Sequence, residues 1–236
     1  MSKSCVNSKI AKRLKRFRPA LKKRGPFYLK VNNIYLKDIM KQKIILASTS
    51  PRRKELLRQI GLDFDVMPSD FEEDMIQKLS HKNLAKTLAL GKARAVSGKF
   101  KNGIVIGADT FVVYGGKRIG KPKDKNDARK MLRTLSGKTM KIYSGLAVID
   151  AGSKKELLDC EVALVKMSKL SNKEIDDYIK TDEPLDKAGA FAVQGIGDVF
   201  IEKISGCYSS VIGLPLRSLY KSLNKFGINI FDFEDS

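Results

Sequence analysis

Four short clusters in this sequence combine charged side chains with residues that expose the backbone. The first is Ser48-Thr49-Ser50-Pro51-Arg52-Arg53, which joins an apolar run to a helical pattern. Backbone N–H groups and the positive end of a helix make such a junction a natural phosphate site, and the guanidinium groups of Arg52 and Arg53 match phosphate oxygens in shape. We therefore expect Ser48 and Arg53 to hold phosphate. The alternative is a capped helix with solvated arginines.

A second cluster, Gly107-Ala108-Asp109-Thr110, places a carboxylate directly after an apolar strand pattern. Ligands of open α/β sheets gather at the carboxyl ends of strands, so Asp109 lies where chemistry is usually done. Together with Glu72, Glu73 and Asp74, it suggests a site of hard oxygen ligands for magnesium or manganese. The alternatives are a turn aspartate that binds nearby backbone amides and a solvated acidic loop.

Two further clusters supply lysines and an amide. Gly120-Lys121-Pro122 holds a lysine after an expected hairpin, without the spacing of a Walker P-loop. Lys121 and Lys92 can each meet a phosphate as a point charge, with a surface lysine as the equal alternative. Gln194 lies near the end of the small-residue stretch 186–195, and its amide has the donors and the acceptor needed to bind the edge of a pyrimidine base.

Scarce residue types exclude other chemistry. His81 is the single histidine, which rules out a multi-histidine metal site and paired histidine bases, and we expect its side chain to be solvated. Cys5, Cys160 and Cys207 are odd in number and far apart, so neither a disulfide framework nor a thiolate zinc site is predicted. Catalysis must then depend on carboxylates, cations and a bound metal.

The elements that must position these clusters alternate along the chain. Apolar runs predict strands at residues 44–47, 64–67, 104–108, 111–114, 141–149, 157–165 and near 200. Helical periodicity and capping signals predict helices at residues 51–60, 83–96, 124–135, 171–179 and 215–226. This interleaving predicts an α/β protein with a mixed sheet and flanking helices.

The net charge of +20 is concentrated near the amino terminus. Residues 1–39 contain twelve Lys or Arg and one acid, Asp38, and the helix breakers Pro19 and Gly25 interrupt their basic stretch. We expect residues 1–39 to be a disordered basic extension and residues 40–236 to form the folded domain. The extension has three interpretations: sequence upstream of a natural start at Met40, a tether for nucleic acid or another acidic surface, and an organelle-targeting segment or ordered addition.

No apolar run approaches the length of a membrane-spanning helix, and the first residues lack the apolar core of a signal peptide. We therefore expect a cytoplasmic protein with no membrane partner. Nucleic acid is expected to bind, if at all, through the basic extension alone.

In order and wording, the motifs resemble those of the Maf family of nucleotide pyrophosphatases from about residue 43 to residue 226. The matching segments are Leu46-Ala47-Ser48, Ser50-Pro51-Arg52-Arg53, Glu55-Leu56-Leu57, Gly107-Ala108-Asp109-Thr110, Gly120-Lys121-Pro122, Met131-Leu132, Leu135-Ser136-Gly137, 183–189, Gln194-Gly195 and 211–216. The resemblance implies a fold similar to inosine triphosphate pyrophosphatase, with two lobes around a cleft, and a homodimer. It also implies hydrolysis of dTTP and UTP to the monophosphate and pyrophosphate with a divalent cation, Mg or Mn.

The resemblance further implies roles for single residues. Asp109 matches the catalytic acid–base residue and a metal position. Arg52, Thr110 and Gln194 match positions associated with the choice of base. The positions that hold metal or phosphate are matched by Glu73, Lys92 and Lys121. Phe191 and Cys207 depart from the Tyr and Ser that are common in the family.

The enzymatic assignment depends on Asp109 and the cationic side chains of Arg52, Lys92 and Lys121 lining one groove. Two alternatives stay open. One is a pyrophosphatase for modified or methylated nucleotides, such as 7-methylguanosine triphosphate. The other, from a different class, is a basic nucleic-acid-binding regulatory module.

Overall fold

The computed structural model describes residues 30–31, 34–35, 42–72 and 78–233. The chain divides into two units, residues 1–41 and residues 42–236. In the first unit, β1 (Lys30–Val31) pairs antiparallel with β2 (Ile34–Tyr35). The expectation of disorder concerns residues that lie mostly outside the described ranges.

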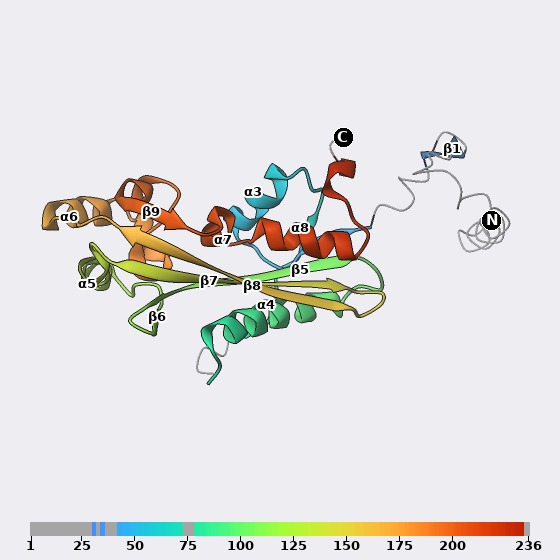
Figure 1. The fold of residues 1–236 in the computed structure, drawn as a ribbon, viewed down its shortest axis with the longest axis horizontal. Helices are drawn as coiled ribbons and strands as arrows, with labels where there is room; N and C mark the ends of the chain where they lie inside the picture. The colour runs from blue at the N-terminus through green and yellow to red at the C-terminus, as the bar shows by residue number, and fades with distance from the viewer. Residues whose placement is uncertain (1–29, 32–33, 36–41, 73–77, 234–236) are drawn as a thin grey trace. The chain divides into compact units, whose positions relative to one another are not determined.

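One seven-stranded mixed sheet runs through residues 42–236 (Figure 1). Its strands are β3 (Ile44–Leu46), β4 (Asp65–Val66), β5 (Ile104–Tyr114), β6 (Lys117–Ile119), β7 (Thr139–Asp150), β8 (Glu156–Met167) and β9 (Ile201–Ser205). Their order is β4-β3-β5-β7-β8-β9, with β6 added beside β5. β3 lies parallel to β4 and β5, and the other pairs are antiparallel.

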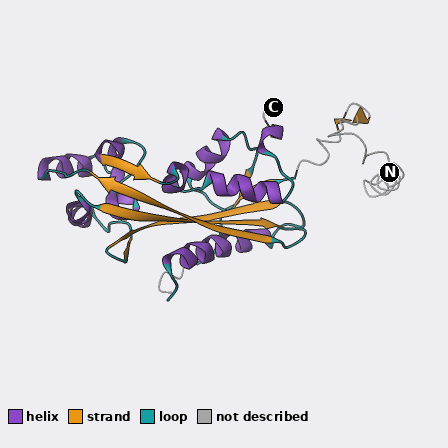
Figure 2. Ribbon diagram, viewed as in Figure 1, coloured by secondary structure: helices purple, strands orange, loops and turns teal. Residues whose placement is uncertain are grey.

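Helices cover both faces of this sheet (Figure 2). They are α3 (Pro51–Gln59), α4 (His81–Ser97), α5 (Lys125–Leu135), α6 (Asn172–Lys180), α7 (Tyr208–Ile212) and α8 (Leu216–Lys225), with 3₁₀ turns η1 (Glu183–Asp186), η2 (Ala188–Ala190), η3 (Ile196–Phe200) and η4 (Ile230–Phe233). α4 packs on β5, β7 and β8, while α7 and α8 pack on the opposite face of β7 and β8. The expected α/β fold with a mixed sheet and flanking helices is therefore confirmed. Among the described residues, no helix has the length and apolar character needed to cross a membrane.

Alternation along the strands explains the two-sided core. Ile45 and Val105 pack with Ala89 of α4, whereas their neighbours Ile44 and Ile104 belong to the larger cluster on the other face. Successive side chains of a strand point to opposite faces, so apolar runs such as 44–47 supply both layers at once.

Local signals correctly place several helix boundaries. At the start of α6, in the range expected for a helix, Ser171 and Glu174 form a capping box. Asp124 caps α5, since its carboxylate accepts from the Asp127 N–H. Ser50 precedes α3 but makes no side-chain capping bond. There, Pro51 at the first helical position supplies the start signal.

The structure corrects one expectation that bears on function. Residues 104–108 and 111–114 are not two strands but the single strand β5, so Asp109 lies inside a strand and not after its end. The backbone of this middle part pairs throughout with β7. On the other edge of β5, β3 pairs with it only as far as Ile106, and β6 pairs with it only from Val112 onward. Within the described residues, positions 107–111 therefore have no strand beside them on that side.

Candidate active site

A cavity of about 630 Å³ is lined by the part of β5 that faces this gap, together with the start of α3 and the segment from η1 to Gly195. Pockets for small molecules commonly have volumes of roughly 300 to 1,000 Å³. Cations outnumber carboxylates in its lining, which contains Arg52, Arg53, Lys92, Lys121 and Lys187 against Asp109, Glu183 and Asp186. The structure thus brings the side chains of Asp109, Arg52, Lys92 and Lys121 to one groove, as the assignment requires.

Asp109 is buried, and its carboxylate faces α4. Lys92 Nζ donates to Asp109 Oδ1 over 2.6 Å, and the two side chains are 14% and 8% exposed. Two glycines allow α4 to lie this close to the sheet. A Cβ on Gly107 would lie 2.4 Å from the Ala89 carbonyl oxygen, and a Cβ on Gly145 would lie 2.0 Å from the Ala85 carbonyl oxygen. The close packing of this helix determines where Lys92 meets the carboxylate.

The start of α3 supplies two more cations. Its first turn contains Arg52 and Arg53 and no acidic residue. Cations at a helix amino terminus oppose the helix dipole, so this arrangement favours a bound anion. Arg53 is anchored at the same time, since its Nε donates to the Gly213 carbonyl over 2.9 Å and its Nη1 to Ser48 Oγ over 3.1 Å.

Ser48 differs from the expectation. Of the described residues near this turn, Ser50 lines the cavity and Ser48 does not. The Ser48 hydroxyl oxygen accepts from Arg53 and from the Ser50 N–H, the latter over 3.3 Å. Ser48 therefore orients the arginine and the turn. Ser50, Arg52 and Arg53 are the residues of this turn that line the cavity.

Lys121 enters from the loop after β6. The Gly189 N–H donates to the Gly120 carbonyl over 2.9 Å, which ties this loop to η2. Asp186 forms an ion pair with Lys187 beside it. Although burial acts to raise it, the pKa of Asp186 lies below its ordinary value because of Lys187, Arg52 and Lys121. Three cations therefore act on one region of the cavity.

Gln194 lines the cavity on a loop that a carboxylate holds in place. Glu183 accepts from the N–H groups of Ile196 and Gly197 over 2.9 and 2.8 Å and from the Tyr178 hydroxyl over 2.9 Å. Burial opposes ionisation, but these donors hold the pKa of Glu183 below its ordinary value. The role of Glu183 as an anchor could not be deduced from the sequence. Its only local signal is a Glu-Pro pair that begins a turn.

Thr110 and Asp109 both line the cavity although successive strand residues point to opposite faces. Because no described strand lies beside positions 107–111 on that edge of β5, side chains from both faces can border the cavity. On its own face, Thr110 Oγ1 lies 2.8 Å from Ser144 Oγ and 3.4 Å from the Gly213 carbonyl oxygen.

The described residues contain no cluster of three or more His, Cys, Asp or Glu side chains suited to a metal ion. Glu73 lies outside the described residues. Asp109 is the described member of the expected pair, and it lines the cavity.

His81 does not behave as a freely solvated side chain. Its ring is half-buried, and its centroid lies 5.3 Å from that of the Tyr143 ring and 6.3 Å from that of the Phe111 ring.

Cys160 is a partly buried thiol, and its burial raises its pKa to about 11. Neither Cys160 nor His81 is among the residues that line the cavity.

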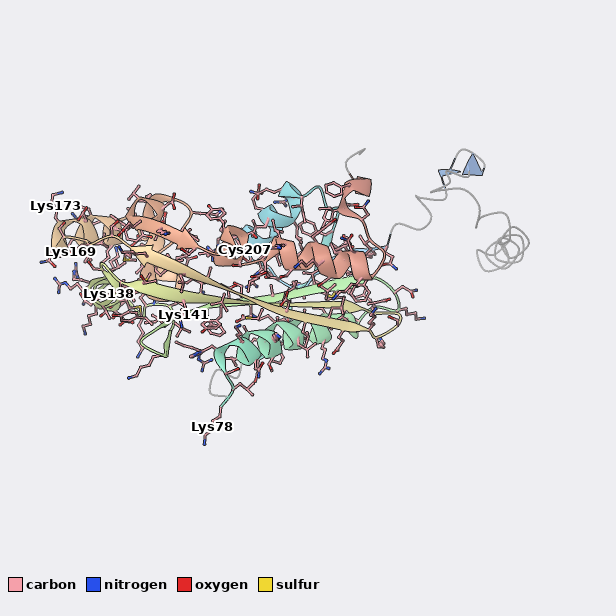
Figure 3. All side chains as sticks on the ribbon, viewed as in Figure 1. Lys78, Lys138, Lys141, Lys169, Lys173 and Cys207 are labelled. Carbon is pink, nitrogen blue, oxygen red and sulfur yellow. The ribbon has the colours of Figure 1, made fainter. Side chains whose placement is uncertain are left out.

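Much of the remaining positive charge is spread over the surface. Lys78, Lys138, Lys141, Lys169 and Lys173 are exposed and lie outside the cavity lining (Figure 3). The cavity therefore holds only part of the positive charge of the described residues.

A family model described as Maf-like protein matches residues 43–226, a range that contains every residue lining the cavity. The chain belongs to the Maf family. Within the Maf family, a dTTP/UTP pyrophosphatase of Alkaliphilus oremlandii is 50% identical over 193 residues, covering 81% of this chain and 100% of the relative. Proteins of the same name from Methanosarcina barkeri and Desulforamulus reducens are 48% and 46% identical, covering 81% and 79% of this chain and 98% of each relative.

Two solved structures are more distantly similar to this Maf protein. The Staphylococcus aureus Ham1 protein is 15% identical with a TM-score of 0.38, over 54% of this chain and 72% of that one. A HAM1 protein from Coxiella burnetii is 14% identical with a TM-score of 0.35, over 55% and 74%. At these TM-scores the likeness carries no argument about the site.

Proposed function

We propose that this chain hydrolyses dTTP and UTP to the nucleoside monophosphate and pyrophosphate, assisted by Mg or Mn. The observation that carries the proposal is a buried carboxylate, Asp109, in a nucleotide-sized cavity whose lining is rich in cations. The names and identities of the Maf relatives support the choice of substrate.

The phosphates are proposed to bind in the cationic part of the cavity. Lys92, Lys121 and Arg53 provide positive charge for a triphosphate, and cations held in place stabilise the charge that grows on the leaving pyrophosphate. Asp109 orients a water molecule for attack on the α-phosphorus and accepts its proton. The bond from the α-phosphorus to the bridging oxygen breaks, and pyrophosphate departs with that electron pair.

A metal ion that binds together with the nucleotide phosphates suits this site. Mg²⁺ is usually held by one or two carboxylates together with substrate phosphates, and Asp109 provides such a carboxylate. When bound, the ion neutralises phosphate charge. We propose Glu73 as the second carboxylate. The Phe71 ring lies against Gly91, where a Cβ would be 2.3 Å from it, so the described chain before residue 73 passes beside Lys92.

Arg52, Thr110 and Gln194 are proposed to select the base. All three line the same cavity as Asp109. Their guanidinium, hydroxyl and amide groups can each form directed hydrogen bonds with the edge of a pyrimidine.

We also propose a cytoplasmic location, which cell fractionation would test, and a homodimer, which sedimentation analysis would test.

The decisive experiment measures product release from the full chain with dTTP, UTP, CTP and 7-methylguanosine triphosphate. We expect pyrophosphate and the monophosphate as products, the highest kcat/KM for dTTP and UTP, and loss of turnover in EDTA that Mg or Mn restores. Preference for 7-methylguanosine triphosphate would support the alternative substrate class. Release of orthophosphate, or no turnover of any nucleotide, would overturn the proposal.

A further inference from the structure

Ser144 is a fully buried serine whose hydroxyl lies next to the proposed base-selecting Thr110. The two residues are direct cross-strand partners in β7 and β5. Ser144 Oγ lies 2.5 Å from the Ser210 carbonyl oxygen of α7 and 2.8 Å from Thr110 Oγ1. Ser144 is 0% exposed, whereas Thr110 is half-buried and lines the cavity.

The direction of these hydrogen bonds follows from counting protons. A carbonyl oxygen only accepts, so the single Ser144 hydroxyl proton must be donated to Ser210. In the contact between the two hydroxyls, Thr110 is then the donor and Ser144 Oγ the acceptor. The longer contact of Thr110 with the Gly213 carbonyl also requires Thr110 to donate. In either contact the Thr110 proton is committed to the protein.

We infer that Ser144 is a positioning residue for base selection, because it commits the Thr110 hydroxyl proton to the protein and leaves that oxygen able only to accept a hydrogen bond from a nucleotide. This inference rests on the proposed function. Uracil and thymine carry an N–H at ring position 3, which can donate to Thr110. Cytosine carries a lone pair there, so two acceptors would face each other without a proton between them.

The cost of that mismatch is what gives selectivity. A buried acceptor without a donor is expensive, and sites built around a hydrogen bond discriminate strongly against ligands that cannot make it. Because the Ser144–Ser210 bond joins β7 to α7, the polarity is in place before a nucleotide binds. Ser144 has no need to touch the nucleotide.

The test compares kcat/KM for UTP and for CTP in the full chain, in Ser144→Ala, in Thr110→Val and in the double variant. In Ser144→Ala the Thr110 hydroxyl keeps only the longer contact to Gly213 and can rotate to donate, so we expect the UTP-to-CTP ratio to fall about tenfold. Thr110→Val should lower the ratio similarly. The double variant should match Thr110→Val, since Ser144 acts only through that hydroxyl.

Controls separate this effect from loss of structure. The ratio for two substrates does not depend on the fraction of folded enzyme. Ser144→Cys, which keeps a weak donor of similar size, should give an intermediate ratio if the alanine variant folds poorly. Ser218→Ala removes a serine hydroxyl that is 2% exposed and donates to Glu161, and it should leave the ratio unchanged.

Several outcomes would overturn the inference. An unchanged ratio in Ser144→Ala, additive losses in the double variant, or equal losses for both substrates, as expected if Thr110 binds a cation, would each contradict it. Failure of the proposed function would give a different result from failure of this inference. In that case the unmodified chain would release no pyrophosphate from UTP.

Discussion

Lys92 and Asp109 form an ion pair with 2.6 Å between Nζ and Oδ1, and it joins α4 to the middle of β5. Both side chains are largely shielded from water, at 14% and 8% exposure. An ion pair that is shielded from water is stronger than an exposed one, so each side chain helps to fix the position of the other. The pair therefore links the packing of a helix to the orientation of the proposed catalytic carboxylate.

Asp109→Asn should abolish most turnover while the fold is kept. Asparagine retains the shape but cannot accept the proton of the attacking water, so kcat is expected to fall about 10²- to 10⁴-fold. Pyrophosphate release and circular dichroism measure the two effects. Asp150→Asn, at the end of β7, is a control that should retain activity. Full activity in Asp109→Asn would remove Asp109 from its role.

Gly145→Ala should separate α4 from the sheet. The added Cβ would lie 2.0 Å from a backbone carbonyl, which cannot move without shifting the helix. Overpacking of this kind costs about 1–3 kcal/mol of unfolding free energy, and here it should also reduce kcat through displacement of Lys92. Gly98→Ala is the matched control, because its nearest contact is an ordinary 3.7 Å. Equal stability of the two variants in urea would contradict the argument.

Glu183→Gln should loosen the loop that holds Gln194. Folding lowers the pKa of Glu183, so its stabilisation is fully present above pH 4.5, the ordinary value, and is lost as pH falls through the lower pKa of the folded state. Near neutral pH the variant should lose about 1–3 kcal/mol of unfolding free energy, and the difference from the unmodified chain should shrink in acid. Denaturant titrations at several pH values measure this.

A surface carboxylate provides the comparison for that experiment. Glu202→Gln removes an exposed partner of Lys166 and should change stability little. KM for UTP should rise only in Glu183→Gln. A loss in that variant that is independent of pH would show that the carboxylate charge is not the anchor.

Arg52→Ala should weaken nucleotide binding without affecting stability. Loss of a charged hydrogen bond to a ligand corresponds to about a 10- to 100-fold decrease in kcat/KM. Arg58 lies on the same helix, where it pairs with Glu55 and does not line the cavity, so Arg58→Ala should keep kcat/KM. Similar kinetics in both variants would exclude Arg52 from the site.

Local sequence patterns predicted much of the secondary structure for physical reasons that act over a few residues. The hairpin of β5 and β6 before Gly120 and the helix that begins at Pro51 depend on neighbours in the chain. The continuity of β5 was not predictable in this way. A charged residue in an apolar run suggests an interruption, but pairing with β7 carries the strand through Asp109.

The sequence by itself determined the chemistry available, namely the arginines beside a helix start, the carboxylate at 109, the lysines at 92 and 121, and the family to which these motifs belong. Only the tertiary structure decided that Ser48 orients Arg53, that Glu183 anchors the Gln194 loop and that Ser144 sets the polarity of Thr110. The reason is distance along the chain. Arg53 and Gly213 are 160 residues apart, and Ser144 and Ser210 are 66 apart, so no local pattern records that folding brings them into contact.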